Sequence, residues 1–426
     1  MTTEVVIMNR RAAVLAADSA GTVTSFANGK AETRYFKGEN KVFQLSEHHP
    51  MGLMTFGNAH VLQVPWDIIV KLFRRELGNR SFPTVEGYAK AFFDYVEQNH
   101  AVFTTDLRES AFAYRVLGLA GRIAHEIFAK VGGSNDAPAI DAAIAEWRAR
   151  IVSNPVTAPF TEADVAPAVA RANSTAKADC DSFFLGTPIA LVAAGREVEL
   201  IEVAVQLAFR ELGDGTSPSG IVVAGYGDDH IFPACFQYRV RGFQLDKLIW
   251  DREEESVITP QQPGYINSFA SNAMVETFAS GVGEEVYANV LRCYGPSAEA
   301  IIREVEGKLS ATVPPKDRAQ IIAQCRKDFM SDWVGRTIQN HHGPLTNVVS
   351  MLSIEEMAHL AENLVSLESL KEKMTRSTET VGGPVDVAAI TKSEGFVWIR
   401  RKLYFDAALN PRYAHRVARM QGGRDE

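Results

Sequence analysis

The sequence is poor in cysteine, in long apolar runs and in excess basic charge, and each shortage excludes a class of protein. Four cysteines in 426 residues, none of them in a C-x-x-C pair, disfavour a disulfide scaffold, a zinc ribbon and an iron–sulfur protein. We therefore expect Cys180, Cys235, Cys293 and Cys325 to be reduced core thiols of a cytoplasmic protein. No apolar run approaches the roughly 20 residues that span a bilayer.

The charge balance is mildly acidic, with 44 Lys and Arg against 52 Asp and Glu and a formal net charge of -8. Such a chain offers no basic surface to a nucleic-acid backbone or to an anionic membrane. The start Met1-Thr2-Thr3-Glu4 lacks the basic patch and apolar stretch of a secretory signal, so none is expected. A hydrophobic content of 46% is enough for one large core or two smaller ones.

Strand patterns occur near the start of the chain. Two β-branched or apolar runs flank the polar Asn9-Arg10-Arg11 and predict a hairpin over 3–17, and a second pair flanks His48-His49-Pro50 and predicts one over 41–57. The Gly/Thr/Asn-rich stretch 21–40 between them looks irregular.

The rest of the chain alternates between helical and strand patterns. Helical spacing is found at 64–77, 83–98, 108–172, 200–212, 268–278, 284–340 and 353–374, the last opened by the capping box Ser353-x-x-Glu356. Strands are predicted at 220–225, 235–240, 385–390 and 396–400, and the acidic run 251–255 is predicted to be a solvated loop. This order indicates α+β layers rather than strict βαβ alternation.

The beginning of the chain also carries potential chemistry. Removal of Met1 would leave Thr2 with a hydroxyl and a free α-amine on one residue. An α-amine has an unperturbed pKa near 8, so it can take the hydroxyl proton and act as the base for its own nucleophile. A nearby lysine would lower the amine's pKa by charge repulsion, and a carboxylate would hold that lysine in place.

The segments 2–7, 13–19 and 41–45 together resemble the opening of a proteasome β-type subunit, a family that includes the bacterial ATP-dependent peptidase. The resemblance implies that Thr2 is the nucleophile, that Asp18 and Lys41 support it, and that the N–H of Gly57 stabilises an oxyanion. Lys37 is a rival for the lysine, but Lys41 directly enters an apolar strand where its stem can be buried.

Later segments resemble the same family more weakly. The stretch 265–271 is similar to a strand-to-helix corner that carries a serine near the nucleophile, and either Ser268 or Ser271 fits that position. The family also has an Asp and a Ser just before its final double glycine, which corresponds here to Gly382-Gly383. The nearest residues in this chain are Thr378, Glu379 and Val381, so this accessory pair has no counterpart in the local sequence.

The resemblance implies a four-layer αββα sandwich of the N-terminal nucleophile (Ntn) hydrolase type, as one domain. Its core would cover about 2–99, 216–283 and 351–404, with helical insertions at about 100–215 and 284–350 and a tail at 405–426. The implied activity is amide-bond hydrolysis through an acyl-enzyme on Thr2, on a peptide or, second, on a small-molecule amide. A catalytically silent proteasome-fold scaffold is the alternative.

We expect no cofactor and no metal, because His48-His49 and His341-His342 lack a ligand spacing and further ligands. Proteasome-like subunits stack into rings, so the resemblance also implies a homo-oligomer. Whether an ATPase partner exists is left open, and neither nucleic acid nor membrane is expected as a partner.

Overall fold

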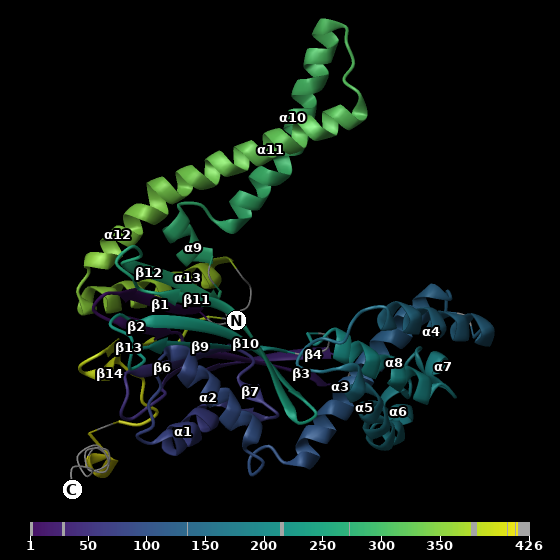
Figure 1. Cartoon of the computed structure of the whole chain (residues 1–426), viewed down its shortest axis with the longest axis horizontal. Helices are drawn as coiled ribbons and strands as arrows, with labels where there is room; N and C mark the ends of the chain where they lie inside the picture. Colours follow the sequence, from purple (N-terminus) through teal and green to yellow (C-terminus); the bar gives the residue numbers. More distant parts are fainter. Residues whose placement is uncertain are drawn as a thin grey trace.

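The computed structural model describes residues 3–27, 30–133, 135–213, 217–271, 273–375, 381–406, 408–413 and 415. The chain has a mixed α+β structure built around two five-stranded antiparallel sheets (Figure 1). Within the described ranges, no helix is long and apolar enough to cross a membrane.

The first sheet has the order β12-β1-β2-β13-β14. Its strands are β12 (Gly264–Ala270), β1 (Thr3–Asn9), β2 (Ala13–Ala17), β13 (Asp386–Thr391) and β14 (Gly395–Arg400). The second sheet has the order β11-β10-β9-β6-β5. Its strands are β11 (Lys247–Val257), β10 (Ala234–Gln244), β9 (Ser219–Gly225), β6 (Met51–Gly57) and β5 (Val42–Gln44).

The two sheets face each other, and helices cover their outer faces. Alternation along β1 decides which side chain enters which layer: Val6 and Met8 join the core between the sheets, whereas Val5 and Ile7 pack under the helices α12 (Gly343–Met351) and α13 (Ile354–Thr375). The outer face of the second sheet is covered by α1 (Trp66–Leu77) and α2 (Val85–Gln98). The result is the succession helices, sheet, sheet, helices.

Three predicted hairpins are confirmed. Strand β1 pairs with β2, β5 with β6, and β13 with β14, all antiparallel. The capping box is also present, since the Ser353 hydroxyl accepts from the Glu356 N–H at 3.2 Å and the Ser353 N–H donates to the Glu356 carboxylate at 2.8 Å. Local sequence is sufficient for these features because the partners are close in the chain.

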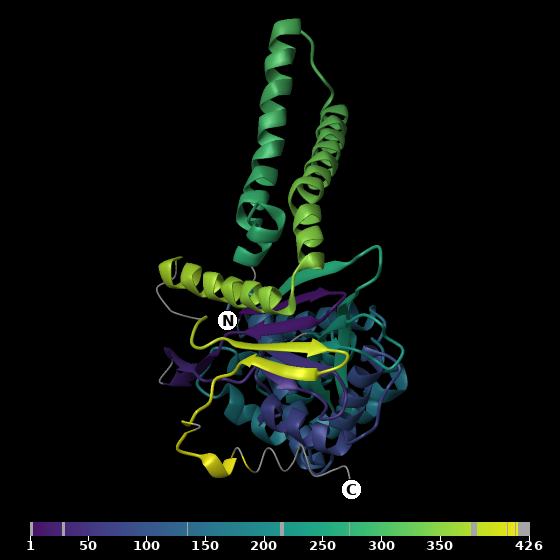
Figure 2. The same ribbon diagram turned by 90° about the vertical axis from the view of Figure 1, so that its left-hand side faces the viewer.

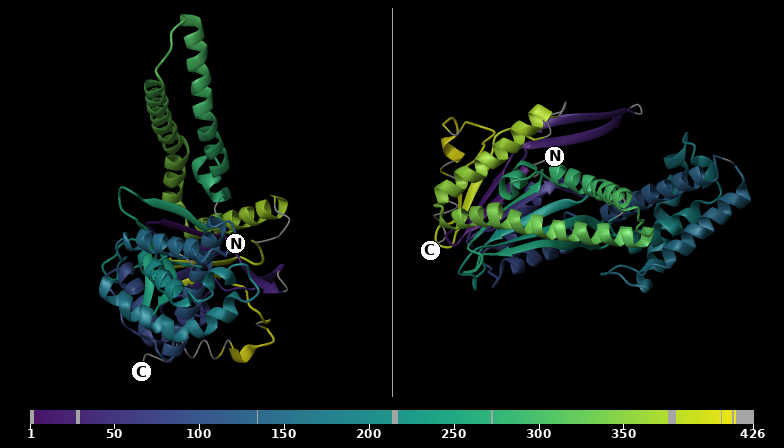
Figure 3. Two further views of the ribbon diagram at one scale, coloured as in Figure 1. Left: turned by 90° about the vertical axis from the view of Figure 1, so that its right-hand side faces the viewer. Right: turned by 90° about the horizontal axis from the view of Figure 1, so that it is seen from above.

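The expectation for residues 21–40 is wrong. They contain a long hairpin, β3 (Ala20–Ala27) paired with β4 (Lys30–Lys37), which extends from the side of the first sheet (Figure 3). The stretch Thr22-Val23-Thr24 is β-branched and suits a strand, although glycine and asparagine nearby give it the composition of a loop.

Two further expectations need correction. Ser268–Ala270 belong to β12, and the helix expected at 268–278 begins only at Ala273 as α9 (Ala273–Ser280). The acidic run 251–255 lies within β11 rather than in a loop. Its Glu254 accepts from the Tyr265 hydroxyl at 2.9 Å, a contact with the other sheet that local sequence does not reveal.

The helices between the sheet segments form a body with its own core. They are α3 (Thr105–Lys130), α4 (Ala137–Val152), α5 (Glu162–Thr175), α6 (Lys177–Phe184), α7 (Ala190–Ala193) and α8 (Glu197–Arg210). Their buried side chains, among them Phe112, Ile123, Ile144 and Phe209, cluster together beside one end of the sheets (Figures 1 and 3).

A second helical segment projects away from the sheets as an antiparallel hairpin, which we call the arm (Figures 1 and 2). It consists of α10 (Glu284–Leu309) and α11 (Pro315–Thr337), neither of which contains a buried residue. Tyr287 stacks near Trp333, with ring centroids 4.9 Å apart. Cys293 and Cys325 lie exposed on the arm, so the expectation of core thiols holds only for the buried Cys180 and Cys235.

Candidate active site

The candidate site is centred on the point where β1 begins and β2 ends. The hairpin register pairs Glu4 with Ala17, so Thr3 and Asp18 are adjacent across the strands. The Asp18 N–H donates to the Thr3 carbonyl at 3.2 Å, and the Thr3 N–H donates to the Asp18 Oδ1 at 3.1 Å. Thr2, the predicted nucleophile, lies outside the described residues together with Met1.

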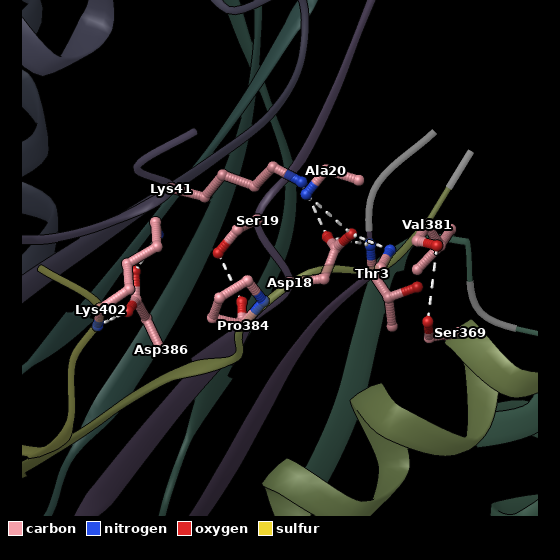
Figure 4. A network of polar contacts seen from close by, with 11 residues as sticks. Thr3, Asp18, Ser19, Ala20, Lys41, Ser369, Val381, Pro384, Asp386 and Lys402 are labelled. Atoms are coloured by element: carbon pink, nitrogen blue, oxygen red, sulfur yellow. Dashed lines mark hydrogen bonds and ion pairs between the residues drawn. The ribbon is translucent and has the colours of Figure 1, made fainter. Parts of the chain in front are cut away.

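Lys41 reaches the same carboxylate from the second sheet. It stands directly before β5, and its Nζ donates to the Asp18 Oδ1 at 2.7 Å (Figure 4). The pair is shielded from water, since the two side chains are only 5% and 0% exposed. The rival Lys37 is exposed on β4. The structure therefore brings Asp18 and Lys41 together, as the sequence analysis expected.

Asp18 is held by the backbone on its other side as well. Its Oδ2 accepts from the N–H groups of Ala20 at 3.2 Å and Gly382 at 2.8 Å. Gly382 and Gly383 have φ values of +147° and +84°, a region that favours glycine. With four donors in all, the carboxylate has a partner at each of its roughly four lone-pair sites. This double-glycine loop thus closes the site from the side of β13.

Gly57 is the last residue of β6 and lies at the end of the second sheet where Lys41 enters β5. Two residues before it, the Thr55 N–H donates to the Lys41 carbonyl at 3.0 Å, and the neighbouring Phe56 ring stacks on Phe269, the strand partner of Glu4, with centroids 6.0 Å apart. Gly57 has φ +75°, and a Cβ there would lie 2.7 Å from the Pro218 carbonyl oxygen. This position accepts only glycine without strain.

The pairing of β6 with β9 also decides whether Gly57 is hydrogen-bonded to β9. The next residue, Asn58, donates its N–H to the Pro218 carbonyl at 3.1 Å. In an antiparallel pair, hydrogen-bonded and non-hydrogen-bonded residues alternate. Gly57, which is opposite Ser219, therefore falls at a position that is not hydrogen-bonded to β9.

The two candidate serines occupy different places. Val5 pairs with Ser268, so Ser268 lies within the sheet, two residues away from its edge at Thr3. Ala270 is the residue that pairs with Thr3, and Ser271 follows it directly in the chain. Ala270 has φ +65°, which turns the chain sharply before Ser271. Of the two serines, the structure brings only Ser271 to the start of β1.

Ser271 has a partner that the sequence analysis missed. Its hydroxyl donates to the Glu368 Oε1 at 2.9 Å, and the Met274 N–H donates to the Oε2 at 2.7 Å. Glu368 is fully buried on α13, 97 residues further along the chain. A glutamate on a helix is ordinary in sequence, so no local feature distinguishes it. Of the residues nearest to the family's accessory Asp and Ser positions, Thr378 and Glu379 lie outside the described residues, and the Val381 carbonyl accepts from the Ser369 hydroxyl at 3.4 Å (Figure 4).

A further carboxyl group belongs to Glu4, which follows Thr3 on β1. Glu4 is fully buried, and neither of its carboxyl oxygens has a hydrogen-bond partner among the described residues. Burial raises the pKa of this carboxyl well above its usual range, the positive charge of Lys41 lowers it in part, and the negative charge of Asp18 raises it further. The sequence analysis attached no role to Glu4.

The two histidine pairs lie in two turns of the chain. Among the residues that the structure describes, no group of three or more His, Cys, Asp or Glu side chains is arranged to hold a metal ion. His48 and His49 lie in the turn before β6, and His341 and His342 lie in the π-helical turn Ile338–His342. The candidate site is thus described by its carboxylates, its lysine, its serine and its backbone N–H groups.

Two comparisons with known proteins were made for this chain. No protein-family model matches it, and no curated protein matches it either.

Proposed function

We propose that this chain is an Ntn hydrolase that cleaves amide bonds with Thr2 as its nucleophile. The observation that carries the proposal is the buried Asp18–Lys41 pair, with Asp18 accepting from the very N–H that links Thr3 to Thr2. The succession of helices, sheet, sheet and helices supports the αββα sandwich that the resemblance implies.

In the proposed reaction, loss of Met1 leaves the Thr2 amine free. The Lys41 ammonium lowers the pKa of that amine, so that the amine is neutral and takes the proton of the Thr2 hydroxyl. The Oγ then attacks the substrate carbonyl, and the Gly57 N–H stabilises the oxyanion. The amine passes its proton to the leaving nitrogen, and water hydrolyses the resulting acyl-enzyme.

Ser271 fits this scheme as a group that orients the amine. Its hydroxyl proton is committed to Glu368 at 2.9 Å, so its oxygen is left as an acceptor. An α-amine that donates one hydrogen to this oxygen would direct its lone pair elsewhere, including toward its own hydroxyl. Peptide is the first proposed substrate class and a small-molecule amide the second, both on the basis of the resemblance.

The proposal is tested with three variants in a peptidase assay on unstructured peptides. Thr2→Ala is expected to abolish hydrolysis and to leave cooperative melting intact, because one residue supplies both nucleophile and base. Lys41→Met is expected to cost a comparable factor, whereas Lys37→Met, at an exposed side chain of β4, is the matched control. Inactivity of the Lys37 variant with full activity of the Lys41 variant would contradict this assignment.

We also propose that the chain forms a closed homo-oligomer, which the exposed arm supports. Apolar side chains on it, such as Ile301 at 65% and Leu309 at 70% exposure, lie open to solvent in the part of the chain that the structure describes. Light scattering of the wild type is expected to give a multiple of the monomer mass, and removal of 290–330 to change it. A monomer at micromolar concentration would contradict this part of the proposal and leave a free-standing amide hydrolase.

A further inference from the structure

Glu4 carries a buried carboxyl group that makes no hydrogen bond or ion pair with any residue that the structure describes. It lies on β1 between Ala17 of β2 and Phe269 of β12. Its side chain has the same parity as Val6 and Met8, whose side chains enter the core between the sheets. An ionised carboxylate without hydrogen bonds is strongly disfavoured in such surroundings. Two unpartnered oxygens in this apolar layer therefore call for an explanation.

The two charged groups that act on the pKa of Glu4, Lys41 and Asp18, already compensate each other. Lys41, which precedes β5, and Asp18, which follows β2, form a close pair at 2.7 Å. Asp18 accepts from three backbone N–H groups in addition, so its carboxylate is satisfied without any contact to Glu4. A second negative charge here would leave two carboxylates sharing one ammonium in a buried space.

We propose that Glu4 is a positioning residue that remains protonated in the active protein and thereby keeps Lys41 paired with Asp18 alone. This inference rests on the proposed function, because its purpose concerns the Thr2 amine. The burial of the carboxyl raises its pKa, in agreement with the protonated form.

The consequence for the site follows from simple electrostatics. With Glu4 neutral, the Lys41 ammonium has one counter-charge and retains two N–H donors that no described residue accepts. Its field then lowers the pKa of a neighbouring amine. Ionisation of Glu4 adds a second counter-charge, weakens that field and draws the ammonium away from Asp18. A rise in pH that ionises Glu4 should therefore switch the site off.

The protonation of Glu4 is tested first by stability, without any activity assay. A carboxyl whose pKa is raised in the folded state binds its proton more tightly in the folded than in the unfolded protein. Its contribution to the free energy of unfolding is therefore complete below the unfolded pKa of about 4.3 and is lost as pH rises toward the folded pKa. Relative to Glu4→Gln, the unfolding constant of the wild type is expected to grow up to tenfold per pH unit above about pH 4.3. The control Glu76→Gln, at a side chain 64% exposed, is expected to give no such trend. A pH-independent difference between wild type and Glu4→Gln would overturn the proposal.

The second test follows kcat/KM of the purified full-length chain against pH. Glu4→Gln mimics the protonated acid, so it is expected to keep activity at pH 7 within about threefold and to lose the alkaline decline of the wild type. Loss of activity at neutral pH, or an unchanged alkaline decline, would overturn the positioning role. If the wild type hydrolyses no amide, the proposed function fails, while the stability measurement still decides whether Glu4 is protonated.

Discussion

Replacing Asp18 with asparagine should be among the most destabilising single changes in the protein. Asp18 is 1% exposed and accepts from Lys41, Thr3, Ala20 and Gly382. The asparagine side chain would carry no charge, so the Lys41 ammonium would be buried without compensation. Its amide NH₂ would also face backbone N–H donors. Breaking a buried pair in this way costs about 3–5 kcal/mol.

The same reasoning predicts strong coupling between the two partners. Lys41→Met leaves the carboxylate with its three backbone donors, so we expect a loss of about 3 kcal/mol. The double variant removes both charges and is expected to cost less than the sum of the single changes by about 2–3 kcal/mol. Urea unfolding at pH 7, followed by circular dichroism, measures all three free energies of unfolding.

A surface pair provides the control for this cycle. Lys71 and Asp67 are four residues apart on α1, with side chains 52% and 28% exposed. Asp67→Asn is expected to cost under about 1 kcal/mol, because water screens the pair. The account is refuted if Asp18→Asn costs no more than the control, or if the Asp18 and Lys41 changes are additive.

Four further changes probe the fold and the surroundings of the site. Gly57→Ala, which places a Cβ 2.7 Å from the Pro218 carbonyl oxygen at φ +75°, is expected to lower the free energy of unfolding by about 1–3 kcal/mol, measured in urea. Ser271→Ala strips Glu368 of a donor and should cost about 1–3 kcal/mol with a fall in kcat, whereas Ser268→Ala, inside β12, should leave kcat unchanged. Ser353→Ala removes the capping box of α13 and should cost about 1 kcal/mol by thermal melting with activity retained.

The parts of the fold and site that sequence can predict are those fixed by short-range pairing. The β1–β2 hairpin has apolar strands and a polar turn, and its register alone places Asp18 beside Thr3. Lys41 is expected beside Asp18 through the resemblance, and its entry into an apolar strand, where its stem can be buried, favours it over Lys37. The β3–β4 hairpin escapes such a prediction, since its composition is that of a loop.

Other parts depend on long-range packing and leave no local trace. Glu368 meets Ser271 only because α13 packs against β1 and α9, and nothing near either residue in the sequence indicates this contact. Glu4 reads as an ordinary polar residue at a strand start, although the fold buries it completely. Its burial depends on Phe269 and on the second sheet, which local patterns do not place.

The central claim, that Thr2 acts with a free α-amine, is tested most directly by covalent trapping. The purified protein is treated with an electrophile that bridges a hydroxyl and an amine on one residue, and the adduct is located by intact mass and peptide mapping. The account predicts a chain that lacks Met1 and carries one adduct on Thr2, with much slower labelling in the Lys41→Met variant. A chain that retains Met1, or an adduct confined to another residue, would contradict it.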